Sequence, residues 1–192
     1  MELTHPITDR DKIDAMADYL YNKNIRDYVL FEIGINIGIR VTDFTKQQVG
    51  FYRRACELGY IELEPSKTKR MHKKVRVPIS DDMLELISSY IKDRLDTEYM
   101  FPSRKGGGAL TRQQVYNILT DAAEHVGIKE NIGCHGMRKT FGYWHYYYNK
   151  DIRILMDIFN HSNEDITLRY IGVKDEDKKE SMKNMNLGVR TI

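Results

Sequence analysis

IRDYVLFEIGINIGIR, residues 25–40, is the stretch that decides the fold. Over residues 25–37, a helix built from this stretch is apolar on nearly every face. Because such a helix belongs inside a protein, we expect a buried central helix that ends at Gly38 and sets Arg40 at the edge of the core. The apolar side chains are Val29, Leu30, Phe31, Ile33, Ile35 and Ile37.

Helical periodicity extends on both sides of this stretch. Upstream, Thr8 to Asp11 has the pattern of a helix cap with an acid three residues on, and apolar residues follow at helical spacing up to Tyr21. Downstream, caps and periodicity predict further helices. One begins at Ser80 with apolar residues to Leu95, and a second begins at Thr111 and stops at Gly127. Two more cover about 135–148 and about 152–159, and a last one runs from Ser162 through Tyr170.

Two strands are predicted between these helical regions. Residues 60–64 alternate, with Ile61 and Leu63 on one face, and residues 75–79 alternate in the same way. Only a short segment joins them, so they should form a small antiparallel sheet. The expected fold class is therefore mainly α (α+β), a helical domain with a small antiparallel β-sheet.

The chain from the end of the first predicted strand through the second is strongly basic. No acid lies between Glu64 and Asp81, although the net charge of the whole chain is only +2. A solvated hairpin is the more common explanation of such a run, and a phosphate-facing element is the functional alternative. The basic residues are Lys67, Lys69, Arg70, Lys73, Lys74 and Arg76.

Composition indicates one soluble globular domain. The chain has 192 residues, of which 41% are hydrophobic and 30% charged, and this is enough for one sizeable core. No apolar run reaches the length of a membrane span, and the N-terminus has no secretory pattern. Cys56 and Cys134 lack metal-ligand spacing and favour a reducing cytosol. We therefore expect a cytoplasmic protein without a membrane partner.

Short polar motifs in the second half of the chain suggest chemistry. In HGMRKTF, residues 135–141, His135 and Arg138 are three positions apart and share a helix face. Asn160-His161-Ser162 and Thr167-Leu168-Arg169-Tyr170 follow. Each motif alone is weak evidence, because a His-x-x-Arg pair usually marks a polar helix face and the chain has 13 tyrosines.

Taken in order, these motifs resemble the tyrosine recombinases, also called the phage integrase family. The resemblance runs from about residue 5 to about residue 175, and His161 and Tyr170 have the spacing of the family's final motif. Family positions in the right order and at roughly the right spacing are hard to obtain by chance. The matching stretches are Gly38–Asp43, Lys67–Lys69, Val75–Ile79, His135–Phe141, Asn160–Ser162 and Thr167–Tyr170.

The resemblance implies a site-specific DNA recombinase that works through a 3′-phosphotyrosyl bond to Tyr170. Arg40 and Arg138 would each offer a planar fork of donors to the non-bridging phosphate oxygens, where negative charge develops. The resemblance assigns His135 as the proton acceptor or organiser of the site. It assigns His161 as a donor to a non-bridging oxygen.

Two further site positions carry alternatives. The resemblance gives protonation of the leaving 5′ oxygen to a hairpin lysine, which we match to Lys67. Lys69 is the alternative, because the hairpin is the least constrained region of the resemblance and Lys69 stands where the family more often has glycine. Asp43 matches a family acid that orients the site, and a helix cap or core-rim acid is an equal alternative. The motifs lack carboxylates that would hold Mg²⁺, so no metal and no cofactor is expected.

The expected partner is double-stranded DNA with specific recombination sites. The resemblance implies a homo-tetramer on DNA, is compatible with a monomer off DNA, and suggests a phage, plasmid or transposon as the source. Charge and placement suggest DNA contacts beyond the catalytic groups. These are Lys69, Arg70, Lys73 and Lys74 on the hairpin, and Arg112, Gln113 and Gln114 at the start of the Thr111 helix.

The ends of the chain depart from the family pattern. Most members carry a separate N-terminal core-binding domain, whereas the first helix here begins near Thr8. We therefore expect residues 1–192 to be a single catalytic domain without that segment, with a core over about 5–175 and a tail over about 176–192. Residues 174–183 are expected to form a charged surface helix. Met182, Met185 and Leu187 form either an apolar patch for a neighbouring protomer or a frayed end.

One departure lies inside a motif. Lys139 stands where many members have histidine after the second arginine, and we expect its side chain to face away from Arg138.

Other functions compete with a recombinase. A non-catalytic DNA-binding regulator on the same fold would form no covalent adduct at Tyr170. A type IB topoisomerase-like enzyme would relax DNA of arbitrary sequence. A metal-dependent nuclease would lose its activity in EDTA.

Overall fold

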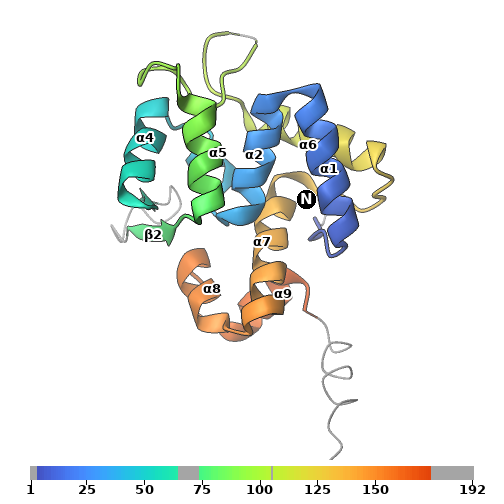
Figure 1. Ribbon diagram of the computed structural model, residues 1–192. Coiled ribbons are helices and arrows are strands. Elements are labelled where there is room, and N and C mark those ends of the chain that lie inside the picture. The colour runs from blue at the N-terminus through green and yellow to red at the C-terminus, as the bar shows by residue number, and fades with distance from the viewer. Residues whose placement is uncertain (1–3, 65–73, 105, 174–192) are drawn as a thin grey trace, which may run out of the picture.

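The computed structural model describes residues 4–64, 74–104 and 106–173. These residues form mostly helices and a small antiparallel sheet, which confirms the predicted fold class (Figure 1). No helix in these ranges is long and apolar enough to cross a membrane. The elements are α1 (Arg10–Lys23), α2 (Ile25–Asn36), α3 (Val41–Phe44), α4 (Val49–Leu58), β1 (Tyr60–Leu63), β2 (Val75–Pro78), α5 (Asp81–Ile91), α6 (Arg112–His125), α7 (Gly133–Asn149), α8 (Ile152–Phe159) and α9 (Glu164–Ile171).

Helix α2 is the buried central helix that the sequence predicts. Leu30 and Phe31 have no exposed surface, and α2 packs against α1, α5 and α7. The helix ends at Asn36, and the chain then turns at Gly38 with φ +71°. A Cβ added to Gly38 would lie 2.3 Å from the Phe141 ring, so both the backbone conformation and the close contact require glycine here.

The two predicted strands pair antiparallel. Ile61 lies opposite Val77, and both side chains are buried. On the other face, the Glu62 carboxylate accepts hydrogen bonds from Lys74 Nζ at 2.9 Å and Arg76 Nε at 2.5 Å. The sheet prediction is confirmed, and the polar face of the sheet holds a cluster of paired charges.

Several helix boundaries differ from the predicted ones. The N-cap of α1 is Asp9, whose side chain accepts a hydrogen bond from the Asp11 N–H, and the prediction of Thr8 was wrong. Helix α5 ends at Ile91, so Leu95 lies beyond it and is 70% exposed. Helices α3 and α4 were not predicted. The predicted tail helix over 174–183 lies outside the described residues.

The helix that begins after Thr111 has the predicted cap. Thr111 Oγ1 accepts a hydrogen bond from the Gln114 N–H, and the Gln114 side chain accepts one from the Thr111 N–H. This reciprocal capping box holds the first turn of α6. Ser80 occupies the equivalent position before α5 but makes no side-chain cap bond.

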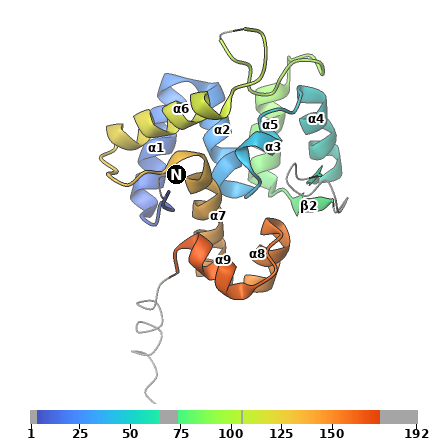
Figure 2. The same cartoon turned by 180° about the vertical axis from the view of Figure 1, so that it is seen from behind.

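Buried apolar side chains form two cores, which meet where Ile158 packs against both and where α8 contacts β2. The large core contains most of the buried residues from Ile7 to Met137 and lies among α1 to α6, the sheet and the first half of α7. The small core consists of Leu155, Phe159 and Ile171, with partly buried neighbours. Figures 1 and 2 show α8 and α9 beside the far half of α7, away from the main bundle.

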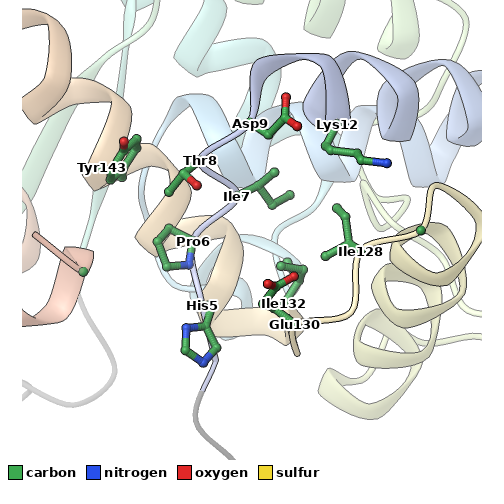
Figure 3. Close-up of a pocket in the computed structure, with 12 residues that line it drawn as sticks. His5, Pro6, Ile7, Thr8, Asp9, Lys12, Ile128, Glu130, Ile132 and Tyr143 are labelled. Carbon is green, nitrogen blue, oxygen red and sulfur yellow. The ribbon is translucent and has the colours of Figure 1, made fainter.

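The N-terminal segment before α1, residues 4–9, lies across α7 and is called the strap below. The Ile7 N–H donates to Thr140 Oγ1 at 2.9 Å, and its carbonyl accepts from the Trp144 indole at 2.9 Å. Beside this segment lies a pocket of about 500 Å³, also lined by the loop after α6. Figure 3 shows the segment running between Tyr143 of α7 and Ile128 of that loop. The strap therefore ties the start of the chain to the helix that carries Arg138.

Candidate active site

Arg138 lies on α7 where the two cores meet, and only 4% of its surface is exposed. Its Nη1 donates to the Gly38 carbonyl at 2.5 Å, and its Nη2 lies 3.5 Å from the Ile158 carbonyl. The guanidinium also lies over the Phe159 ring, 4.3 Å from the ring centre. A guanidinium has more N–H donors than these contacts use, so donors remain for a further anion.

Burial is the largest influence on the charge of Arg138. Loss of hydration lowers the pKa of Arg138 to about 10, while the charges of Tyr170 and Asp43 act in the opposite direction. At neutral pH the guanidinium therefore stays protonated. A buried cation of this kind is a preorganised partner for a phosphate.

Arg40 approaches the same site from the large core. It follows the turn at Gly38 and is the N-cap residue of α3, with a half-buried side chain. Its positive charge lowers the pKa values of Arg138, His161 and Tyr170. The predicted place of Arg40 at the edge of the core is confirmed.

Asp43 lies in the first turn of α3, and its charge raises the pKa of Arg138. The N-cap of that helix is Arg40, with no side-chain cap bond, so the helix-cap alternative for Asp43 was wrong. The half-buried carboxylate of Asp43 therefore lies close enough to Arg138 for its charge to act on that guanidinium.

His161 is fixed at both its backbone and its ring. It follows Asn160, the left-handed C-cap of α8, and its N–H donates to the Met156 carbonyl at 2.9 Å. Its ring nitrogen Nδ1 lies 3.1 Å from Thr167 Oγ1. Burial, and then the charges of Arg138 and Arg40, lower the pKa of His161 below its usual 6.5. The imidazole is therefore neutral at neutral pH.

Tyr170 lies on α9 with its ring against the rings of Phe159 and His161, both at 5.3 Å between centres. Burial raises the pKa of its hydroxyl above 10. The charges of Arg138 and Arg40, and a hydrogen bond with Arg138, lower that pKa in part. The phenol is thus protonated at neutral pH but lies beside the groups that would stabilise its anion.

The Lys139 side chain contacts the N-terminal segment and the ring of Tyr170. Its Nζ donates to the Thr4 carbonyl at 2.6 Å and lies 5.5 Å from the centre of the Tyr170 ring. The lysine therefore joins the N-terminal segment to the helix of Tyr170.

His135 lies in the first turn of α7 and is half-buried. The spacing of three residues places it on the same side of the helix as Arg138. With Arg112, Tyr116 and Cys134 it lines a small pocket of about 200 Å³ beside the start of α6. The structure thus brings His135 near Arg112, one of the predicted DNA contacts.

The other predicted DNA contacts fall into three groups. Lys74 is exposed and paired with Glu62, an ion pair that is weak at the surface and open to exchange with phosphate. Arg112 and Gln113 are exposed at the start of α6, whereas the Gln114 side chain is used in the capping box and by Ser103. Lys67, Lys69, Arg70 and Lys73 lie outside the described residues.

Two contributors to the site were missed by sequence reasoning. Phe159 supports both Arg138 and Tyr170, and Thr167 contacts the His161 ring. Thr167 lies three positions before Tyr170, which is a signal that helix periodicity could have used. Within the described ranges, no group of three His, Cys, Asp or Glu side chains is arranged to hold a metal ion.

Comparison with known proteins places the chain in a family. Residues 7–177 match the model of the phage integrase family. The chain belongs to this family, the tyrosine recombinases, as its motifs indicated.

Sequence identity to individual relatives supports this family membership. The chain is 42% identical over 177 residues to the probable integrase/recombinase YoeC of Bacillus subtilis, covering 92% of this chain and 93% of that protein. It is 26% identical over 151 residues to the type 1 fimbriae regulatory protein FimE of Escherichia coli, covering 76% and 73%.

Solved structures share the fold. The XerA recombinase superposes with a TM-score of 0.75 at 16% identity, covering all of this chain and 68% of that one. The catalytic domain of bacteriophage HP1 integrase superposes with a TM-score of 0.60 at 20% identity, covering 98% and 99%. The fold is therefore that of a recombinase catalytic domain.

Proposed function

We propose that this protein recombines DNA at specific sites by forming a transient 3′-phosphotyrosyl bond at Tyr170. The observation that carries the proposal is the convergence of Tyr170, His161 and Arg138 at the small core, with Arg40 reaching the same point from the large core. No single one of these residues would suffice, because each has common structural roles.

The chemistry is phosphoryl transfer at a diester. Tyr170 Oη attacks phosphorus, the bond from phosphorus to the 5′ oxygen breaks, and the 5′ oxygen leaves as a hydroxyl. Negative charge grows on the non-bridging oxygens during this step. Arg138 and Arg40 would stabilise that charge with fixed, permanently protonated donors. Attack of the 5′ hydroxyl on the phosphotyrosine reverses the step, so rejoining needs no added energy source.

Protons must move because Tyr170 begins as a phenol. Because the pKa of the Tyr170 hydroxyl is raised in the free protein, a base must remove its proton. We assign that role to His135. We assign protonation of the leaving oxygen to Lys67, with Lys69 as the alternative. Asp43 would hold the arginines in place, and His161 would donate to a non-bridging oxygen.

Double-stranded DNA with specific recombination sites is the proposed substrate, and a homo-tetramer the proposed assembly on it. Structures of similar fold support DNA as the partner: XerH is solved with its difH substrate, and the Tn1549 transposon integrase with circular intermediate DNA. The exposed start of α6, with Arg112 and Gln113, and the hairpin residues Lys69, Arg70, Lys73 and Lys74 would contact the phosphates.

A nicked, labelled half-site from the genomic neighbourhood of the gene tests the proposal in EDTA. Wild-type protein should become covalently labelled on a denaturing gel. Tyr170→Phe should give no labelled protein, whereas Tyr148→Phe, which changes an exposed tyrosine on α7, should behave as wild type. DNA binding without any adduct would indicate a binding protein. Cleavage that EDTA abolishes would indicate a metal nuclease, and relaxation of arbitrary DNA a topoisomerase-like enzyme.

A further inference from the structure

We infer that Lys139 is a positioning residue that ties the ring of Tyr170 to the strap, so that the strap holds α9 in place against α7. Lys139 then acts on the reaction through Tyr170. The inference rests on the proposed function for its catalytic consequence, while the link between the strap and α9 is a property of the free protein.

The Lys139 ammonium has the strap on one side and the ring of Tyr170 on the other. Its Nζ donates to the Thr4 carbonyl at 2.6 Å and lies 5.5 Å from the centre of the Tyr170 ring. Among the described residues, the Thr4 carbonyl is the only hydrogen-bond acceptor of this ammonium. Burial lowers the pKa of Lys139, so the charge has lost part of its hydration and depends on these two partners.

A second contact joins the strap to the end of α9. Gly172 is the C-cap of α9 with φ +81°, and a Cβ added there would lie 3.4 Å from Pro6 Cγ. The Pro6 ring therefore packs against the turn that ends the helix. Movement of α9 away from α7 would break this contact and the contact between Tyr170 and Lys139 together.

The strap is itself fixed to α7 and to the loop before it (Figure 3). The His5 N–H donates to the Asn131 carbonyl at 2.9 Å, and the Ile7 carbonyl accepts from the Trp144 indole at 2.9 Å. A Cβ added to Gly136 would lie 2.9 Å from the His5 carbonyl oxygen, so the backbone of the strap lies directly on α7. The strap is thus an anchored element to which α9 is attached.

The attachment matters because little else holds α9. The small core has three fully buried side chains among the described residues, and such a region opens at a low free energy. One charge-assisted hydrogen bond is therefore a larger share of the opening free energy here than it would be in the large core. Attack on phosphorus also requires a narrow geometry, since a misplacement of about 1 Å can cost about 100-fold in rate. Holding α9 in place should therefore contribute to the cleavage rate.

Hydrogen exchange of the free protein tests the link without DNA. Lys139→Met keeps an unbranched side chain but removes the charge and the donors. The α9 amides should exchange about 3- to 10-fold faster in this variant, as expected for the loss of one hydrogen bond, while α2 keeps the wild-type rates. Lys139→Arg keeps a charge and donors, so its α9 amides should stay within about twofold of wild type. Unchanged α9 exchange in Lys139→Met would overturn the inference.

Lys12 provides the matched control. It is another half-buried lysine whose ammonium donates to a backbone carbonyl, that of Val126, but it lies on α1 and none of its hydrogen bonds within the described ranges reaches α9. Lys12→Met should lower thermal stability about as much as Lys139→Met and leave α9 exchange and the cleavage rate unchanged. Equal acceleration of α9 exchange in both variants would show a general loss of stability and overturn the inference.

A double-mutant cycle tests whether Lys139 acts through the strap. Trp144→Phe removes the indole N–H that holds the Ile7 carbonyl and changes neither Lys139 nor Tyr170. It should also speed α9 exchange. Combined with Lys139→Met it should add less than its effect alone, because a strap that is already detached from α9 can no longer hold it. Trp144→Phe without effect on α9, or two fully multiplicative effects, would contradict the role of the strap.

Single-turnover cleavage of the half-site at saturating DNA tests the consequence for the reaction. Lys139→Met should cleave about 3- to 10-fold more slowly, and Lys139→Arg should stay within about twofold of wild type, with the Kd for DNA unchanged in both. Cleavage by Lys139→Met at the wild-type rate but with weaker DNA binding would make Lys139 a DNA contact and overturn the inference. If wild-type protein forms no adduct, the proposed function fails, while the exchange rates still decide the link between the strap and α9.

Discussion

The large core and the small core contribute to the candidate site in different ways. The large core is extensive and presents Arg40 from the turn after α2. The small core has only three fully buried side chains among the described residues, yet α9 carries Tyr170 and the loop between α8 and α9 carries His161. Parts of a protein with few buried apolar contacts open more easily than the rest. The proposed nucleophile therefore lies on the part of the molecule that opens at lower free energy.

Arg138 joins these two regions. Its guanidinium bonds the Gly38 carbonyl of the large core and lies over Phe159 of the small core. The same side chain is thus a structural link and a proposed phosphate ligand, whereas Arg40 is half-buried at the rim. The two arginines should therefore respond differently to the same substitution.

The largest expected effect comes from replacing each arginine with lysine. Arg138→Lys and Arg40→Lys should each slow half-site cleavage by about 10²- to 10³-fold, because lysine cannot reproduce the planar fork of donors. Only Arg138→Lys should also lower the free energy of unfolding, by about 1–3 kcal/mol, because it loses the bond to Gly38. Urea titrations beside the cleavage assay check this. Equal loss of stability in both variants would refute the linking role of Arg138.

A pair of leucine truncations tests the separation of the cores. Leu30 on α2 and Leu155 on α8 are both fully buried, and Leu→Ala should cost about 2–5 kcal/mol at either site. Leu30→Ala should lower the stability of the whole domain. Leu155→Ala should speed hydrogen exchange in α8 and α9 and leave α2 protected. If both variants accelerate exchange equally everywhere, the two cores unfold as one unit.

Gly142→Ala should disturb the packing of the small core on α7, with a smaller loss of stability than the leucine truncations. The added Cβ would lie 2.5 Å from Ile171 Cγ2 and 2.8 Å from Phe159 Cζ, so α8 and α9 must shift. Overpacking of this kind costs about 1–3 kcal/mol. Because Tyr170 moves with α9, the cleavage rate should fall while DNA affinity is kept.

Gly108→Ala is the matched control for this substitution. Nothing lies within 4 Å of a Cβ added there, so both stability and cleavage should stay at the wild-type level. A Gly142→Ala variant that cleaves as fast as Gly108→Ala would show that the position of α9 tolerates this shift.

The smallest expected effect is a pH dependence of stability. Burial is the largest cause of the lowered pKa of both His145 and His161, whose usual value is 6.5. Each pKa is lower in the folded state, so the unfolded state binds more protons below pH 6.5. The free energy of unfolding should therefore be largest above pH 6.5 and fall as the pH drops below that value. Urea midpoints from pH 8 to pH 5 measure the fall.

His145 offers a variant that isolates its share of this pH dependence. Its Nδ1 is buried, and within the described residues it has no hydrogen-bond partner. His145→Gln cannot take up a proton, so its stability should fall less steeply below pH 6.5 than that of the wild type. An unchanged slope would mean that this histidine does not contribute.

The sequence could predict what depends on local pattern. The all-round apolar character of residues 25–37 predicted α2, and alternation predicted both strands, because those patterns report burial directly. The motif order predicted that Arg138, His161 and Tyr170 would meet. It could not predict the bond from Arg138 to Gly38 or the stacking on Phe159, because such contacts join residues far apart in the chain. Helix α3 is too short for periodicity to reveal it.

Mapping the covalent adduct by mass spectrometry tests the central claim most directly. After reaction with a nicked half-site and digestion of the DNA, trypsin should release the peptide Tyr170–Lys174, or Ile154–Lys174 if the adduct blocks cleavage at Arg169. Either peptide contains Tyr170 as its only tyrosine among the 13 in the chain. A nucleotide-modified peptide with fragment ions that place the phosphate on Tyr170 is the predicted result. A phosphate on any other residue, or none anywhere on protein that has cleaved the DNA, would contradict it.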